Sequence, residues 1–296
     1  MATSLNVVTG FVFTHRDELI TKASLDSKTL KYVEIMPNVK WKDALNYLDS
    51  EISFQDGANC GFNPNGSDTF SEKTIETKAI KVEKSWCYKD WEKTAQNYQL
   101  MWEAGRIQIP WEEKVADSNL GKIQEAVEDL VWKGDSGLSI DGFVKLITDV
   151  ESASTIAASG ITSASTIADK IDAVVEAIPQ RALKKGVNVF LSYTDFRAYV
   201  KLLNSTCCAN RPIQDAAVEE LGYLGDSRVK LVPVSGLEGT GHIVAAPADA
   251  LVYATDIEGS ENEYKMWENE ETEKVNFRVL FRAGMALKFS DEIVYA

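Results

Sequence analysis

The stretch VNFRVLFRAGMALKF, residues 275–289, carries an apolar side chain at every second position. Polar side chains such as Asn276, Arg278 and Arg282 occupy positions between them, on the opposite face of the same stretch. A period of two is typical of a half-buried β-strand, and this many residues in that conformation would reach about 50 Å. Ordinary strands have about five or six residues. The pattern therefore predicts one strand about as long as a compact globule of this size, which suits a protein that reaches its neighbours.

A second extended stretch covers residues 74–86. Ile75, Thr77 and Ala79 share one face, and the apolar phase then moves by one residue to Ile80, Val82 and Trp86. Such a shift indicates either a bulge or a strand that passes between two environments. The tract before it, residues 56–67, is rich in Gly, Asn, Asp and Pro, which are typical of tight turns. The loop and the charged strand together predict a projecting hairpin.

Helical spacing appears in two later segments. Residues 88–104 have aromatic and small side chains at helical intervals and predict a helix followed by Gly105. Pro110 then opens the longest predicted helix, which Lys133 and Gly134 close. Its expected buried stripe consists of Ala116, Leu120, Ile123, Val127 and Leu130.

The middle of the chain mixes helices and short strands. The hexapeptide SASTIA occurs at 152–157 and again at 163–168, and we expect a loop that leads into an N-capped helix ending near Pro179. A strand at Val187–Ser192 precedes a helix in which Ser192 and Asp195 resemble a capping box. Further strands are expected at Val229–Val234, His242–Ala246 and Leu251–Thr255. The non-repeating order predicts an α+β fold.

Composition excludes several classes of protein. The chain has 296 residues and a net charge of −14, which argues against binding nucleic acid through its phosphates. We find no apolar run of the roughly 18 residues that a membrane span needs, and no basic, apolar leader that would predict a signal peptide. None of the four cysteines forms a C-x-x-C pair, so we expect a reducing compartment.

The candidate chemical motifs are weak. Residues 236–241 are glycine-rich but lack the dinucleotide-binding spacing, and we expect a turn between strands. The acidic stretch 256–273 fails the calcium-loop pattern, so we expect a solvated or partner-facing loop, with weak divalent cation binding as the alternative. Trp91, Tyr98 and Trp102 are expected in the core. We assign no catalytic, cofactor or metal residue and expect no enzyme.

Five segments resemble a known family. EKSWCYKDWEK at 83–93, VWKGD at 131–135, VFLSYTDFR at 189–197, VPVSGL at 232–237 and ATD at 254–256 resemble, in this order, major capsid proteins of tailed bacteriophages of the Hong Kong 97 type. The likeness is to capsid proteins of phages related to those of Bacteroidetes hosts, and it covers about two thirds of the chain. Two features depart from the family: Ser290 stands where a proline often follows the last strand, and no lysine and asparagine pair can be assigned to covalent cross-linking.

The resemblance implies a domain order. It comprises an N-terminal arm at 1–33, an extended E-loop hairpin at 34–85, a P-domain with a long spine helix at 86–137, an A-domain at 138–250, and a return to the P-domain with the terminal long strand at 251–296. The hairpin is expected to lie over a neighbouring subunit, and Asn63, Pro64, Asn65 and Gly66 are the expected inter-subunit contacts at its tip.

The function that the resemblance implies is structural. The chain would self-assemble as hexamers and pentamers into an icosahedral virion capsid, inside the cytoplasm of the bacterial host, and would enclose double-stranded DNA without binding it specifically. Portal, scaffolding and decoration proteins are possible partners, and no membrane is expected. Two alternatives stay open: an encapsulin-like nanocompartment shell, which would load a protein cargo, and a carboxylate-based enzyme in a soluble oligomer.

Overall fold

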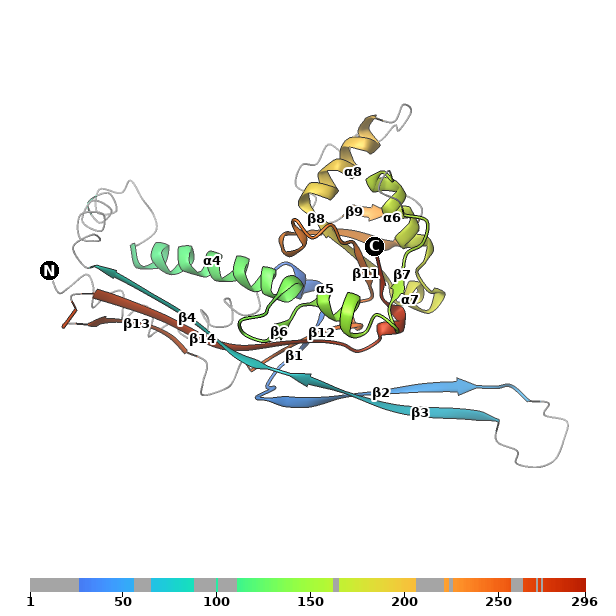
Figure 1. The fold of residues 1–296 in the computed structure, drawn as a ribbon, viewed down its shortest axis with the longest axis horizontal. Helices are drawn as coiled ribbons and strands as arrows, with labels where there is room; N and C mark the ends of the chain where they lie inside the picture. Colours follow the sequence, from blue (N-terminus) through green and yellow to red (C-terminus); the bar gives the residue numbers. More distant parts are fainter. Residues whose placement is uncertain are drawn as a thin grey trace.

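The computed structural model describes residues 27–55, 65–87, 100, 111–161, 165–205, 221–223, 226–256, 263–269, 271–272 and 274–296. Three parts are visible in Figure 1. A long sheet and a helix run along the longest axis, a second domain with its own sheet rises from one side, and a two-stranded hairpin projects beyond the body.

The long sheet is built around one strand, β14 (Lys274–Leu287). Antiparallel β4 (Lys78–Cys87) pairs with one edge of β14 along ten residues. The other edge pairs first with β13 (Glu263–Asn269) and then with β12 (Leu251–Thr255). β1 (Glu34–Met36) adds a parallel strand beside β12. The long terminal strand predicted from the sequence is confirmed.

Burial along β14 differs from the expected half-buried pattern. Val275, Phe277 and Val279 are buried and alternate with partly exposed residues, as a period of two requires. From Phe281 to the end of the strand every residue is buried, and Arg282 is only 4% exposed. The expectation that Arg282 lies on an exposed, charge-tolerant face is therefore wrong, because other parts of the chain cover both faces of this half of the sheet.

The long helix α4 (Trp111–Lys133) has 23 residues and packs along the sheet. Leu120, Ile123 and Val127 are buried, as the predicted stripe requires. Gly134 follows the helix at φ +71°, a conformation that glycine adopts without a steric penalty. The predicted start and end of this helix are confirmed.

The second part of the molecule, here called the six-stranded domain, has a sheet in the order β7-β15-β11-β8-β10-β9. The bounds are β7 Ile156–Ala157, β15 Val294–Tyr295, β11 Val244–Ala246, β8 Val187–Ser192, β10 Asp226–Val234 and β9 Leu221–Tyr223. Its helices are α6 Ile167–Glu176, α7 Gln180–Lys185 and α8 Tyr193–Ser205. β8 and β12 match their predicted ranges, β10 begins three residues earlier than predicted, and β11 omits His242 and Ile243.

Both predicted helix caps are present. The Thr166 side chain accepts a hydrogen bond from the Asp169 backbone N–H, and the Asp169 carboxylate accepts from the Thr166 backbone N–H at 2.8 Å, which completes a capping box. The Ser192 hydroxyl accepts from the Asp195 backbone N–H at 3.0 Å at the start of α8. These local bonds fix where α6 and α8 begin.

Trp132, near the end of α4, connects the long helix to the six-stranded domain. Its ring packs on Phe143 at 5.7 Å and on Phe190 of β8 at 5.1 Å between centroids, and all three side chains are fully buried. Short elements complete this region: η1 Thr29–Tyr32, β5 Gly134–Asp135, β6 Ile140–Asp141, α5 Phe143–Lys145, η2 Leu146–Val150, η3 Ser235–Leu237 and η4 Ser290–Glu292.

The end of the predicted N-terminal arm belongs to the core. Leu30 is 2% exposed, and Glu128 of α4 accepts hydrogen bonds from both the backbone N–H and the hydroxyl of Thr29. Trp132 donates to the same hydroxyl at 2.7 Å. Residues 27–33 of the expected arm thus contact the core, where Thr29 satisfies the buried Glu128 carboxylate.

Other expectations have mixed outcomes. Part of the acidic stretch that was expected to be a loop forms β13, because its backbone pairs with β14. The glycine-rich segment 236–241 lies in a 3₁₀ turn and loop between β10 and β11, as predicted. The predicted helix at 88–104 and the side chains of Trp91, Tyr98 and Trp102 lie outside the described residues.

Candidate assembly interface

A two-stranded hairpin extends from the body of the molecule (Figure 1). β2 (Lys42–Ile52) and β3 (Gly66–Glu76) pair antiparallel along eleven residues, from Lys42 opposite Glu76 to Ile52 opposite Gly66. At the strand rise this ribbon is about 36 Å long. The two strands of the hairpin lie within the expected range 34–85, and two other strands of that range belong to the long sheet, because β1 joins β12 and β4 joins β14.

The change of phase predicted within residues 74–86 marks the point where the chain leaves the hairpin. Thr77 separates β3 from β4, so residues before it pair with β2 and residues after it pair with β14. Of the two explanations offered by the sequence, the passage between two environments is confirmed.

Sequence patterns did not predict β2 as a strand. Trp41, Leu45, Leu48 and Ile52 recur at intervals of four, three and four residues, which is the spacing of a helix face rather than a strand. The segment is extended because β3 supplies backbone partners along its whole length. A signal for a strand lay in β3, which carries Thr69, Phe70, Thr74 and Ile75.

The outer half of the hairpin exposes large apolar side chains. Leu48 lies opposite Phe70, and these residues are 49% and 81% exposed. Ile52 follows on the same face at 80% exposure, and Phe54 just beyond the strand is 99% exposed. Leu48, Ile52 and Phe70, here called the hairpin patch, lie on an element with no core of its own. Grouped apolar side chains of this kind mark a surface that contacts another protein.

Two of the four predicted tip residues can be located. Asn65 donates a hydrogen bond to the Ser53 hydroxyl at 3.2 Å, and Gly66 opens β3 opposite Ile52. Both therefore lie at the outer end of the hairpin. Asn63 and Pro64 lie outside the described residues. A contact of these four residues with another subunit stays a prediction.

The inner half of the hairpin is anchored to the body by apolar and backbone contacts. Leu45 and Ile75 are buried in a small cluster with Val252 of β12 and Ala286 of β14. At the exit, the Thr77 backbone N–H donates to the Trp41 carbonyl at 2.9 Å.

Lys73 on β3 forms a second, polar attachment. Its ammonium lies 2.5 Å from the Glu151 carboxylate, 3.0 Å from the Leu287 carbonyl oxygen and 3.2 Å from the Ser290 hydroxyl. On the neighbouring strand the Tyr47 ring meets Phe289 edge to face, with centroids 5.6 Å apart. The segment that follows β14 thus contacts both strands of the hairpin.

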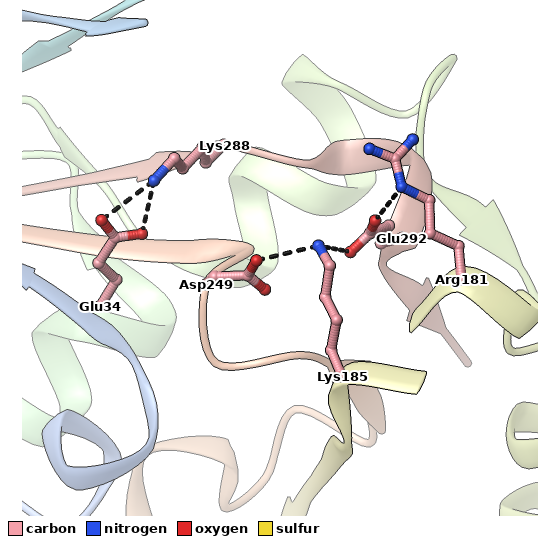
Figure 2. Close-up of polar contacts among 6 residues, drawn as sticks. All are labelled: Glu34, Arg181, Lys185, Asp249, Lys288 and Glu292. Carbon is pink, nitrogen blue, oxygen red and sulfur yellow. Dashed lines mark hydrogen bonds and ion pairs between the residues drawn. The ribbon is translucent and has the colours of Figure 1, made fainter. Parts of the chain in front are cut away.

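The same segment is tied to the six-stranded domain by ion pairs (Figure 2). Glu292 is 1% exposed and lies 2.6 Å from Lys185 and 3.1 Å from Arg181, both on α7. Lys185 also contacts Asp249 at 2.9 Å. Burial opposes the charge on Lys185, but the hydrogen bonds to the two carboxylates outweigh it, so the pKa of Lys185 is raised above its usual value.

Lys288 makes a separate link in Figure 2, to Glu34 of β1 at 2.9 and 3.1 Å. The residues after β14 therefore connect three regions: the hairpin, the edge of the long sheet and α7. The Lys185 ammonium contacts two carboxylates, one of which is buried, and such an arrangement is held more firmly than an exposed ion pair.

The described part of the chain offers little for catalysis or metal binding. It contains no group of three His, Cys, Asp or Glu residues that could hold a metal ion. His242 contacts the backbone oxygen of Ala296 at 3.3 Å, and Cys87 is a free thiol. In the same ranges, no helix is both long and apolar enough to cross a membrane.

Comparison with known proteins identifies the fold. No family model and no curated protein matches the sequence. The structure is similar to a satellite phage P4 procapsid that includes a size determination protein, with a TM-score of 0.64 and 11% identity over 94% of this chain and 89% of that chain. The capsid of an empty GTA particle gives 0.58 and 10% identity over 93% and 89%.

A third similar structure is a virus-like particle from Pyrococcus furiosus, with a TM-score of 0.51 and 10% identity over 94% of this chain and 95% of that chain. These likenesses extend over nearly the whole of each chain. The α+β class and the Hong Kong 97-type fold predicted from the sequence are confirmed.

Proposed function

We propose that this chain is the major capsid protein of a tailed bacteriophage. Many copies would assemble as hexamers and pentamers into a closed icosahedral shell around double-stranded DNA. The observation that carries the proposal is the combination of a capsid-like fold along nearly the whole chain with a hairpin that exposes apolar side chains. Assembly, rather than catalysis, is the activity that such a subunit supports.

The hairpin supplies the proposed contact between subunits. The hairpin patch would lie on a neighbouring copy, so that Leu48, Ile52 and Phe70 lose contact with water. Burying three such side chains would favour association by about 1.5–3 kcal/mol each before the cost of ordering is subtracted. The tip, including Asn63, Pro64, Asn65 and Gly66, would extend this contact.

The domain names of the family follow from the proposal. Residues 1–33 would be the arm, 34–85 the E-loop, 86–137 the P-domain with α4 as its spine helix, 138–250 the A-domain, and 251–296 the return to the P-domain. The six-stranded domain supports the A-domain assignment, since most of its strands come from that range.

The contents and partners of the shell are inferred from charge and resemblance. A net charge of −14 would keep the bulk of the surface from adhering to packaged DNA. The proposal also includes a likeness to phages related to those of Bacteroidetes hosts and assembly in the cytoplasm of the host. Its expected partners are portal, scaffolding and decoration proteins.

An encapsulin-like nanocompartment is the second candidate. The similarity to the Pyrococcus furiosus particle over nearly all of both chains favours it. Such a shell would enclose a protein rather than DNA.

Electron microscopy of the purified protein tests the proposal. We expect closed shells with pentamers and hexamers, and nuclease-resistant DNA inside when phage packaging proteins are present. The variant Phe70→Ser should yield fewer shells. Thr69→Ala, on the other face of the hairpin, is its matched control and should assemble like the wild type. Particles that hold a specific protein cargo would favour the nanocompartment, and a protein that stays monomeric under all assembly conditions would contradict both candidates.

A further inference from the structure

The hairpin has two chain connections to the body, and they lie side by side. One passes through Val39 and Trp41, and the other is Thr77. The Thr77 backbone N–H donates to the Trp41 carbonyl at 2.9 Å, and the Thr77 hydroxyl donates to the Val39 carbonyl at 3.0 Å. Two adjacent attachments define an axis about which a ribbon can swing. They do not by themselves fix its angle.

The outer end of the ribbon would amplify such a swing. Gly66 is eleven residues from Thr77, or about 36 Å at the strand rise. A rotation of about 10° at the axis would therefore move the tip by about 6 Å. A contact between subunits that uses the outer half of the hairpin needs this angle to be set within a narrow range.

Besides the buried apolar contacts of Leu45 and Ile75 with β12 and β14, two hairpin side chains contact residues 287–290 away from the axis. Lys73 lies four residues from Thr77, or about 13 Å along the strand. Its ammonium has three oxygen acceptors, one each from Glu151, Leu287 and Ser290. Tyr47 on the other strand packs edge to face on Phe289. Both contacts end on residues 287–290, which the Lys288–Glu34 pair attaches to the edge of the long sheet.

We propose that Lys73 and Tyr47 are positioning residues that fix the angle of the β2–β3 hairpin by contacting residues 287–290. Lys73 supplies direction, because one ammonium satisfies three acceptors only at one position of the ribbon. Tyr47 supplies a shape-dependent contact on the opposite strand. The inference concerns the single chain. Its consequence for assembly rests on the proposed function, in which the angle decides where the hairpin patch meets a neighbour.

The test measures the angle in the unassembled subunit. Spin labels are attached through a genetically encoded keto amino acid at Ser50 in β2 and at Ala126 on the exposed side of α4, so the native cysteines are left unchanged. Pulsed electron paramagnetic resonance then gives the distribution of distances between the labels. We expect a single narrow peak for the otherwise wild-type chain and a broadened or shifted one for Lys73→Met and for Tyr47→Ala.

Lys42→Met is the matched control. Lys42 pairs with Glu76 across the two strands of the hairpin, so this variant also loses a lysine ion pair but no contact between Lys73 or Tyr47 and the body. It should keep the wild-type distribution. Glu151→Gln removes the charge of the acceptor without changing the hairpin and should act like Lys73→Met. The same narrow peak in Lys73→Met, Tyr47→Ala and their double variant would overturn the inference.

The measurement is independent of shell formation. If the wild-type chain forms no shells, the proposed function fails, while the distance distributions still decide whether Lys73 and Tyr47 fix the angle. Circular dichroism of each variant shows that the labelled subunits are folded, and a variant that unfolds is replaced by Glu151→Gln, which alters only the body side of the contact.

Discussion

Gly284 of β14 lies directly against the backbone carbonyl of Glu76, at the point where the chain leaves the hairpin. A Cβ atom at position 284 would collide with that carbonyl and crowd the Cα of Thr77. β4 pairs with β14 only as far as Lys78 opposite Ala283, so the next position is where the two chain segments cross. The absence of a side chain at this position allows the hairpin to begin so close to the sheet.

Gly284→Ala should therefore destabilise the subunit. Relieving the collision requires the backbone at residues 76–77 to shift, and we expect a loss of about 1–3 kcal/mol in the free energy of unfolding. Gly121→Ala in α4 is the control, because a Cβ there meets nothing within 4 Å and alanine favours a helix by about 1 kcal/mol. Urea denaturation of both variants measures the difference. Equal stability of Gly284→Ala and the wild type would show that the backbone at residues 76–77 can shift without a loss of stability.

Charge introduced in the second half of β14 should be costly on either face. Phe281 is 3% exposed and Arg282 is 4% exposed, and the Arg282 guanidinium lies 4.2 Å from the centre of the Trp41 ring. We expect both Phe281→Asp and Arg282→Asp to reduce the yield of soluble, folded subunit, because each buries a carboxylate for which the described part of the wild-type fold provides no hydrogen-bond or ion-pair partner. Lys274→Asp at the exposed start of the strand should fold normally. A fully folded Arg282→Asp would contradict the burial of this face.

Polar substitution in the hairpin patch should impair assembly and leave folding unchanged. Phe70 is 81% exposed, so Phe70→Ser removes little contact within the subunit. We expect the same thermal midpoint as the wild type but a lower yield of particles, by tenfold or more if the contact loses about 1.4 kcal/mol. Light scattering and thermal unfolding provide the two measurements. Thr69→Ala, on the other face, should assemble normally.

Lys185 should contribute to the stability of the junction between α7 and η4. Lys185→Met leaves the buried Glu292 with Arg181 alone, and we expect a loss of about 1–3 kcal/mol in the free energy of unfolding. Lys184→Met, at the exposed neighbouring position, should change stability by less than about 0.5 kcal/mol. Chemical denaturation compares the two. If their effects are equal, the two ion pairs of Lys185 drawn in Figure 2 contribute no net stability.

Alkaline pH should reveal the contact between Tyr223 and Asp172. Burial, followed by the hydrogen bond of its hydroxyl to Asp172 at 2.8 Å, raises the pKa of Tyr223 to about 12. The unfolded chain loses this proton near pH 10, so the contribution to stability is complete below pH 10 and is lost as the pH rises toward 12. Thermal midpoints of Tyr223→Phe should fall less steeply than those of the wild type across this range, and parallel curves would contradict the assignment.

Local patterns in the sequence were sufficient for the elements whose signals are self-contained. The alternation in residues 275–289 identified β14, and Pro110 with Gly134 delimited α4. The repeat that leads into an N-capped helix predicted α6, and the structure places the cap at Thr166 and Asp169. Periodicity and capping act between residues a few positions apart, so a single sequence displays them directly.

The tertiary structure alone decided the identity of β2, the burial of Arg282 and the attachment of the hairpin. β2 has the apolar spacing of a helix and is a strand only because β3 pairs with it. Arg282 is buried because distant segments, including Trp41, cover its face. Lys73 and Tyr47 meet residues more than two hundred positions away, at Ser290 and Phe289. Such contacts depend on how elements cross in space, and no periodicity within one segment encodes them.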